Sequence, residues 1–339
     1  MSNYFYNDSD FCKEVPSNKV LSHRLADLCK PHEAFCATEN IKYEKIFSIF
    51  DPNIMKNLKN VVFKRTYALG DILTCVPVIR QMKKFYGIEN IYFEKGFRYE
   101  FEKSLFGDIE FIHENKTLDY DIALDSDHVF EQDHQYENDR SYWSRLKILQ
   151  EFLGLPFDKN LDWSYNKAES IPKIPDNCVC LSLYSTTPQR SMTESIMPKI
   201  FDLLFDNGLM PLCMDSNKAC GDERCVNLSK KLTVKQAITV LSNCNALITI
   251  DTGTLWFNHF AQVPMIGLFG STRADEKLDY FPKPDKCVGI DMRSYVGCDK
   301  FCRGNGDYCM KTAPCLKEFN HEQLLSDLDK ALKLLKVGK

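Results

Sequence analysis

Two short segments of this sequence place small and polar residues between an apolar strand and a helical pattern. In residues 248–261, ITIDTGTLWFNHFA, the tetrad Asp251-Thr252-Gly253-Thr254 makes this break. Unpaired N–H groups and the positive end of the helix dipole favour an anion at such a position. Gly253 would allow a close backbone approach, and the two threonines add hydroxyl donors. The segment predicts a phosphate-binding loop; the alternative is a simple helix cap at Asp251 or Thr252 with a glycine turn.

The second break lies in residues 66–77, TYALGDILTCVP. Gly70 gives the turn backbone freedom, and Asp71 stands where the N-cap of the following helix is expected. Asp71 is either that cap or a general base, because a carboxylate at the mouth of a strand-turn-helix unit can accept a proton from a hydroxyl.

The elements around both breaks alternate between strand and helix. Residues 60–67 read as a strand, residues 72–87 as a helix closed by Gly87, and residues 90–95 as a strand, which is a βαβ unit. The second half restarts the alternation. We therefore expect an α/β protein with two Rossmann-like domains facing across a cleft, with ligands beyond the carboxyl ends of the strands.

The expected organisation has three parts. These are an N-terminal extension that packs on the body (residues 1–58), a first Rossmann-like domain (59–165) and a second one (166–339). The connection falls in residues 157–177, which hold aspartates and prolines and show little periodicity.

Composition sets further limits. With 339 residues, 44% hydrophobic and 27% charged, the chain has an ordinary globular composition, and its net charge of −4 gives no reason to expect a polyanionic partner. No segment reads as a signal peptide or a membrane span. The 15 cysteines, apart from a cluster near the C-terminus, are therefore expected to be reduced thiols in the cytoplasm.

Taken together, the two breaks resemble the motifs of glycosyltransferase family 9, the heptosyltransferase-like enzymes. Residues 67–84, YALGDILTCVPVIRQMKK, are similar to that family's strand, Gly-Asp turn and helix. Residues 241–272 are similar to its D(S/T)G…H…A…P…LFG.T signature, in which His259 is the motif histidine. Between them, Arg190 stands where the family has lysine and Met192 where tryptophan is usual.

The resemblance implies a GT-B fold and an inverting transfer from a nucleotide-diphosphate sugar to an acceptor hydroxyl. Asp71 would be the base, and no metal would be required for catalysis. The donor would be held by residues of the second half together with Gly70. These are Ser185, Thr186, Thr187, Arg190, Asp251, Thr252, Gly253, Thr254 and His259. For His259, packing under the loop is an equal alternative. The acceptor could be a glycan, a protein or a modified nucleic-acid base. Residues 98, 99 and 125–143 are candidates to recognise the acceptor. The alternative for the stretch 125–143 is a solvated surface loop.

A cluster of four cysteines lies near the C-terminus within residues 298–315. Cys298, Cys302, Cys309 and Cys315 have C-x3-C-x6-C-x5-C spacing, which predicts a structural Zn or Fe site. Unbound thiols and disulfides are the alternatives.

Two other functions fit the same fold, because a fold does not fix an activity. One is a nucleotide-sugar epimerase or hydrolase, which needs no acceptor. The other is a non-catalytic nucleotide-sugar-binding protein, in which replacement of Asp71 would leave function intact.

Overall fold

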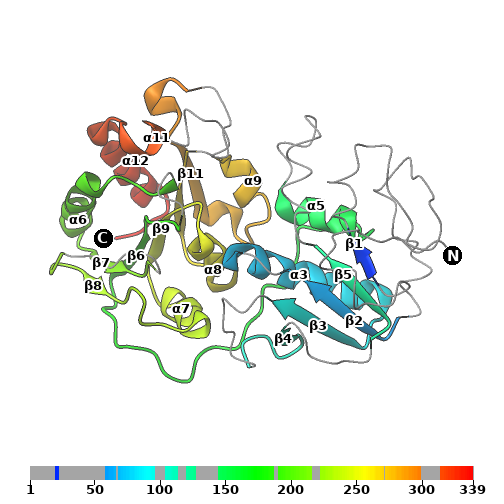
Figure 1. Cartoon of the computed structure of the whole chain (residues 1–339). Helices are drawn as coiled ribbons and strands as arrows, with labels where there is room; N and C mark the ends of the chain where they lie inside the picture. Colours follow the sequence, from blue (N-terminus) through cyan, green and yellow to red (C-terminus); the bar gives the residue numbers. More distant parts are fainter. Residues whose placement is uncertain are drawn as a thin grey trace. The chain divides into compact units, whose positions relative to one another are not determined.

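The computed structural model describes ten stretches of the chain. These are residues 20–22, 58–65, 68–95, 104–113, 120–126, 144–186, 190–215, 222–270, 272–298 and 314–338. The chain divides into two compact units, Met1–Ser164 and Tyr165–Lys339. Each unit contains one parallel sheet with helices (Figure 1).

The sheet of the first unit has the strand order β1-β5-β2-β3-β4, with every pair parallel. Its strands are β1 (Val20–Ser22), β2 (Asn60–Lys64), β3 (Asn90–Lys95), β4 (Glu110–His113) and β5 (Ile122–Asp125). Strand β1 belongs to the segment 1–58 and pairs with β5. That segment, of which only residues 20–22 and 58 are described, therefore contributes a strand to the sheet.

Two helices of the first unit are described, α3 (Leu69–Tyr86) and α5 (Arg145–Phe152). The buried side of α3 includes Ile72, Val76 and Ile79, which pack in the core because their spacing puts them on one helical face. Gly87 ends the helix with φ 72°, a left-handed conformation that glycine adopts without steric cost.

The sheet of the second unit has the order β11-β10-β9-β6-β7-β8, again with parallel pairs. The strands are β6 (Cys178–Ser182), β7 (Met210–Cys213), β8 (Val226–Asn227), β9 (Ala246–Ile250), β10 (Met265–Phe269) and β11 (Cys287–Asp291). This is the Rossmann order 3-2-1-4-5-6, in which the chain reverses its direction of growth between β6 and β9. Ligands of such sheets bind at this switch point.

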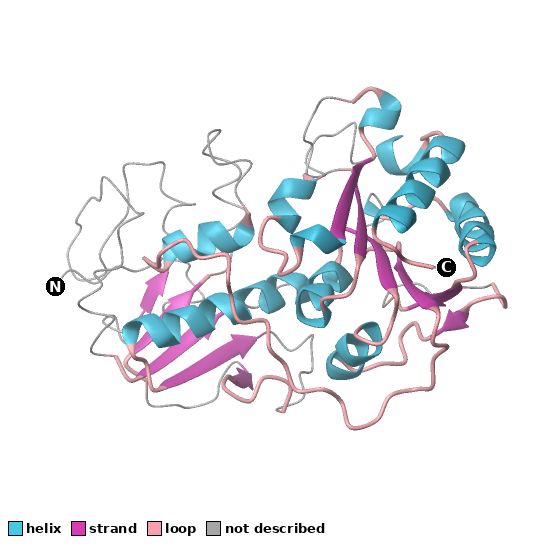
Figure 2. Ribbon diagram, turned by 180° about the vertical axis from the view of Figure 1, so that it is seen from behind, coloured by secondary structure: helices cyan, strands magenta, loops and turns pink. Residues whose placement is uncertain are grey.

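Helices cover both faces of the second sheet (Figures 1 and 2). The structure has α6 (Met197–Asp206), α7 (Val234–Leu241), α8 (Gly253–Ala261), α9 (Ala274–Leu278), α11 (Pro314–Lys317) and α12 (His321–Leu334), with 3₁₀ turns η4 (Glu194–Ile196), η5 (Pro284–Lys286) and η6 (Ser294–Val296). Helix α6 packs against α12, and α7 packs against α8. The core under α6 and α12 holds alternate residues of the central strands, such as Ile248 and Ile250.

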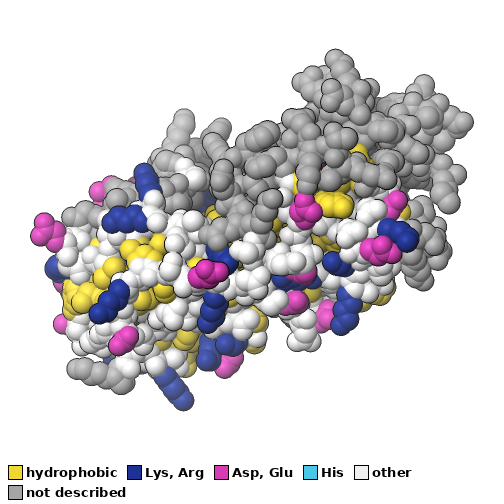
Figure 3. Space-filling view, turned by 90° about the horizontal axis from the view of Figure 1, so that it is seen from below, with side chains coloured by type: hydrophobic (Ala, Val, Ile, Leu, Met, Phe, Trp, Pro, Cys, Tyr) yellow, Lys and Arg dark blue, Asp and Glu magenta, His cyan; other side chains and the backbone are white. Residues whose placement is uncertain are grey.

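On the face that Figure 3 shows, lysine and arginine side chains alternate with aspartate and glutamate side chains. This mixture agrees with the nearly balanced composition. Among the described helices, none combines the length and the apolar character needed to cross a bilayer.

Candidate functional site

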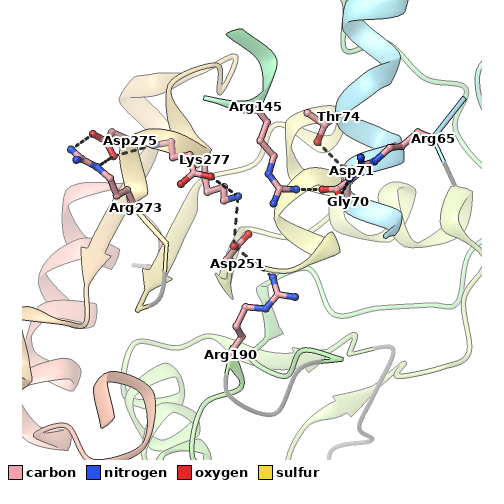
Figure 4. A network of polar contacts seen from close by, with 11 residues as sticks. Arg65, Gly70, Asp71, Thr74, Arg145, Arg190, Asp251, Arg273, Asp275 and Lys277 are labelled. Atoms are coloured by element: carbon pink, nitrogen blue, oxygen red, sulfur yellow. Dashed lines mark hydrogen bonds and ion pairs between the residues drawn. The ribbon is translucent and has the colours of Figure 1, made fainter. Parts of the chain in front are cut away.

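In the first unit, the carboxylate of Asp71 is held by two arginines (Figure 4). Arg65 Nη2 donates to Asp71 Oδ2 at 2.5 Å, and Arg145 Nη1 forms an ion pair with Asp71 Oδ1. Asp71 is 6% exposed and Arg65 1% exposed, so water screens the Arg65 contact little. Charge-assisted hydrogen bonds of this kind favour the ionised carboxylate and fix its orientation.

Asp71 is not the helix cap that the sequence suggested. Helix α3 begins at Leu69, and its N-cap is Ala68, which has φ 57° and makes no side-chain cap. Asp71 therefore lies inside the first turn, where its N–H donates to the carbonyl of Ala68 at 3.0 Å. Gly70 has no positive φ, so the unusual backbone conformation of this turn is at Ala68 instead. The Asp71 side chain is thus available for the arginines.

The backbone around Asp71 is fixed by the neighbouring strand ends. Arg65 follows β2, and its Nη1 donates to the carbonyl of Ser126, which follows β5, at 2.9 Å. The hydroxyl of Thr74 donates to the carbonyl of Gly70 at 2.7 Å. Strands β2 and β5 are neighbours on either side of the point where this sheet reverses its growth. Asp71 therefore occupies the position where an α/β sheet binds ligands.

In the second unit, the segment after β9 forms the N-terminus of α8. Thr252 is the N-cap, and its hydroxyl accepts from the N–H of Thr254 at 3.3 Å. Of the two cap candidates, the structure therefore selects Thr252 and leaves the Asp251 side chain for other contacts. Gly253 is the first helical residue and has no positive φ. The helix begins next to the switch point, as an anion site requires.

Asp251 contacts two cationic side chains from the segments that follow β6 and β10 (Figure 4). Arg190 Nη1, from the segment after β6, lies 3.8 Å from Asp251 Oδ2. Lys277 Nζ, from α9 after β10, lies 3.7 Å from the same oxygen and 3.0 Å from Glu276 Oε1. The carboxyl ends of three adjacent strands therefore supply one charged cluster. Arg190 and Asp251 were predicted from the sequence, and Lys277 and Glu276 were not.

A buried chain of polar groups supports the start of α8. Ser182 Oγ lies 2.9 Å from Thr254 Oγ1 and 3.0 Å from Asp215 Oδ1. Asp215 also accepts from the N–H of Tyr184 at 3.2 Å. Burial raises the pKa of Asp215 to about 7, although these hydrogen bonds oppose the shift. These hydrogen-bonded polar groups link the ends of β6 and β7 to the predicted phosphate-binding loop.

His259 is completely buried beneath the loop. Its ring stacks on Trp256 with centroids 4.6 Å apart and meets Phe281 edge-on at 5.2 Å. Burial lowers its pKa to about 4, and hydrogen bonds to the backbone of Leu255 and Lys277 partly oppose this shift. Of the two alternatives for His259, this environment favours packing under the loop as a neutral ring.

The remaining predicted donor residues lie in the segment after β6. The N–H of Ser185 donates to the hydroxyl of Ser191 at 2.9 Å, and Thr186 is exposed. Thr187 lies outside the described residues, as do residues 98, 99 and 127–143 of the acceptor candidates. Met192, at the position where tryptophan is usual in the family, is 1% exposed and fills the core.

Two of the four clustered cysteines are described. Cys298 is half-buried and follows η6, and Cys315 is buried at the start of α11, which packs against η6. Cys302 and Cys309 lie outside the described residues. No group of three or more His, Cys, Asp or Glu side chains with metal-binding geometry occurs in the parts that are described. The metal site stays a prediction.

The fold defines the class of the protein as GT-B. The dodecameric iron-containing glycosyltransferase TibC from enterotoxigenic Escherichia coli superposes with a TM-score of 0.61 at 14% identity, over 82% of this chain and 77% of TibC. E. coli ADP-heptose lipopolysaccharide heptosyltransferase II superposes with a TM-score of 0.54 at 15% identity, over 82% of this chain and 99% of that enzyme. A family 9 glycosyltransferase from Veillonella parvula superposes with a TM-score of 0.52 at 12% identity, over 82% of this chain and 97% of that protein.

The sequence points to one family within this class. Residues 213–291 match the model of glycosyltransferase family 9 (heptosyltransferase), a segment that contains Asp251 and the whole of α8 and α9. No curated protein matches the chain. The resemblance to family 9 and the GT-B class of fold are thereby confirmed, and with them the expectation of a glycosyltransferase.

Proposed function

We propose that this protein transfers a sugar from a nucleotide-diphosphate sugar to an acceptor hydroxyl with inversion at the anomeric carbon. The observation that carries the proposal is the charged cluster at the switch point of the second sheet, where Arg190 and Asp251 adjoin the N-terminus of α8. The helix N-terminus and the Arg190 guanidinium suit phosphate oxygens, and Asp251 suits the hydroxyls of a sugar or ribose.

In this proposal Asp71 is the general base. It removes the proton of the acceptor hydroxyl as the acceptor oxygen bonds to the anomeric carbon, and the nucleoside diphosphate leaves with the electrons of the broken C–O bond. The ionised carboxylate has about four lone-pair sites, of which the two arginines use one on each oxygen. An acceptor hydroxyl can therefore still donate to it.

Charge on the leaving diphosphate is stabilised by protein groups in this mechanism. The N-terminus of α8 supplies backbone N–H groups and a dipole, and Arg190 supplies a cation whose side chain is 34% exposed. The catalytic step as proposed uses no metal ion.

ADP-heptose is the first donor to test. One structure of the similar protein TibC is a complex with ADP-D-β-D-heptose, with a TM-score of 0.62 at 14% identity. The acceptor is a glycan, a protein or a modified nucleic-acid base, and transfer to any of these separates the proposal from an epimerase or a hydrolase. The proposed compartment is the cytoplasm, where buried Cys178 and Cys244, whose sulfurs lie 3.5 Å apart, would stay reduced.

A structural metal is the second part of the proposal. Cys298 and Cys315 come from elements that pack together, so they could supply two of four thiolate ligands, with Cys302 and Cys309 as the others. A zinc or iron ion there would stabilise the segment 298–315. The similar protein TibC is an iron-containing glycosyltransferase.

The experiment is a thermal-shift screen of the purified protein against nucleoside diphosphates and their sugars. A ligand that binds the folded state alone raises the Tm, by an amount that grows with its concentration. We expect a shift with one nucleoside diphosphate and a larger one with a sugar derivative of it. If no compound shifts a folded sample, the protein is not a nucleotide-sugar enzyme.

A further inference from the structure

Lys277 is a completely buried lysine beside the predicted donor site. Its side chain is 0% exposed, and the short helix α9 places it at the end of β10. Burying an ammonium group is unfavourable unless opposite charges and hydrogen bonds compensate for the lost water. Glu276 Oε1, at 3.0 Å from Nζ, supplies one compensating charge, and Asp251 Oδ2, at 3.7 Å, supplies a second.

The hydrogen-bonding capacity of Lys277 is not used up by these contacts. Its Nζ carries three donors, yet within the described stretches it makes no hydrogen bond of acceptable geometry. The distance to Asp251 exceeds by roughly 0.8 Å the value of about 2.9 Å that such charge-assisted bonds reach. Contacts in a site often shorten when the substrate binds. Lys277 is therefore placed to donate a hydrogen bond to Asp251 when a ligand binds.

The two cations beside Asp251 differ in exposure to solvent. Arg190 has a side chain that is 34% exposed, so it can turn toward a phosphate, whereas Lys277 is enclosed on all sides. The His259 ring of α8 also meets the ring of Phe281, which follows α9, edge-on with centroids 5.2 Å apart, and this contact holds the segment of Lys277 against α8. When Arg190 moves, Lys277 stays next to the carboxylate.

Resting on the function proposed above, we propose that Lys277 is the positioning residue of the donor-sugar subsite. It directs the oxygens of the Asp251 carboxylate so that they accept hydrogen bonds from sugar hydroxyls. A carboxylate suits hydroxyls and repels phosphate, so this subsite reads the sugar and leaves the diphosphate to the start of α8 and Arg190.

The test compares Kd values for ADP and ADP-heptose, measured by calorimetry, in native protein and Lys277→Met. We expect the Kd for ADP to stay within about threefold and the Kd for ADP-heptose to rise about 10- to 100-fold, because a hydrogen bond to a charged group is lost. Lys235→Met is the matched control, since Lys235 is also a buried lysine of the second unit. It should leave both affinities unchanged.

A double variant separates positioning from simple charge balance. Lys277→Met alone leaves the buried Glu276 without its 3.0 Å ion pair, which lowers stability for a structural reason. Glu276→Gln/Lys277→Met removes both charges and should recover most of the lost Tm, while ADP-heptose stays about 10- to 100-fold weaker than in native protein. Full recovery of ADP-heptose binding in the double variant would overturn the proposal.

The native protein separates this inference from the function on which it rests. If ADP-heptose binds no more tightly than ADP, and no other nucleotide sugar of the panel binds more tightly than its own diphosphate, the proposed function fails and the inference with it. If native protein binds the sugar form more tightly and Lys277→Met keeps that difference, the inference alone is wrong.

Discussion

The hydroxyl of Ser182, at the end of β6, lies 2.9 Å from the hydroxyl of Thr254 in the first turn of α8. It also lies 3.0 Å from Asp215 Oδ1, so one small side chain joins the ends of β6 and β7 to the predicted phosphate-binding loop after β9. All three residues are buried. The loop is thereby positioned by groups that the solvent does not screen.

Asp215→Asn should change the pH dependence of stability. The pKa of Asp215 is raised to about 7 in the folded state, so between about pH 4 and pH 7 the folded protein binds more protons than the unfolded chain. The contribution of this group to stability is complete below about pH 4, falls as the pH rises, and levels off above pH 7. The slope reaches about 1.4 kcal/mol per pH unit.

Urea unfolding from pH 4.5 to pH 8 measures this slope. Because asparagine does not titrate, native protein should lose stability relative to Asp215→Asn as the pH rises. A constant difference between the two proteins over that range would show that Asp215 is ionised throughout.

Arg65→Met should destabilise the first unit by about 3–5 kcal/mol, because it leaves the Asp71 carboxylate buried with one arginine fewer. The Ser126 carbonyl also loses its donor. Lys59→Met is a suitable comparison, since Lys59 pairs with Glu89 at the surface of the first unit and both side chains are more than half exposed. Chemical unfolding should rank Arg65→Met as the clearly more damaging change, and equal losses would count against a special role for the buried pair.

Gly270→Ala should lower the Tm. A Cβ at this position would lie 2.8 Å from the sulfur of Cys315 and 2.9 Å from Leu316 Cγ, which are core residues of α11. Overpacking of a core costs typically about 1–3 kcal/mol. Differential scanning calorimetry of the variant checks this, and an unchanged Tm would mean that α11 moves freely away from β10.

Metal removal should affect folding more than catalysis. Freshly purified protein is expected to contain about one zinc or iron ion per chain, and Cys302→Ser should lose it. Cys287→Ser is the control, since Cys287 is a half-buried cysteine outside the cluster. Elemental analysis measures the metal content of the native protein and of both variants, with and without treatment with a chelator. Metal-free native protein with an undiminished Tm would contradict a structural ion.

The sequence predicted the elements of the fold well because each is encoded locally. Gly87 marks the end of α3, and the apolar runs around Ile248 and Ile266 mark buried strands. Strand β1 was missed because residues 20–22 have no distinctive period and are strand only through pairing with β5. The cap of α3 was also misjudged, since nothing in the sequence indicates the left-handed Ala68 that starts this helix early, whereas Thr252 was among the candidates for the cap of α8.

The site was predicted only in part, for a similar reason. Asp71, Arg190 and Asp251 belong to motifs, so their types and spacing carry a signal. Arg65 and Arg145 reach Asp71 from a strand end and from another helix, a contact that requires the tertiary fold. Lys277 lies in a charged stretch that reads as a solvated helix, and its burial follows only from the packing of α9.

Asp71→Asn should slow sugar transfer by about 100- to 10,000-fold while the Kd for the donor stays within about threefold, because an amide accepts no proton from the acceptor. Release of nucleoside diphosphate is measured with an acceptor that native protein uses, below the Tm of the variant. Asp108→Asn is the control, since Asp108 is another arginine-paired carboxylate of the first unit. Transfer at the native rate would remove Asp71 as the base.

In the proposed function, a nucleotide-diphosphate sugar binds where β6, β9 and β10 end. Hydrogen–deuterium exchange with and without ADP-heptose tests this location, because bound diphosphate covers the N–H groups at the start of α8. We expect slower exchange in residues 251–257 and 184–192 and no change in α12. Protection that appears only elsewhere, such as in the 370 Å³ groove lined by Ile290, Tyr295 and Asp327, would contradict it.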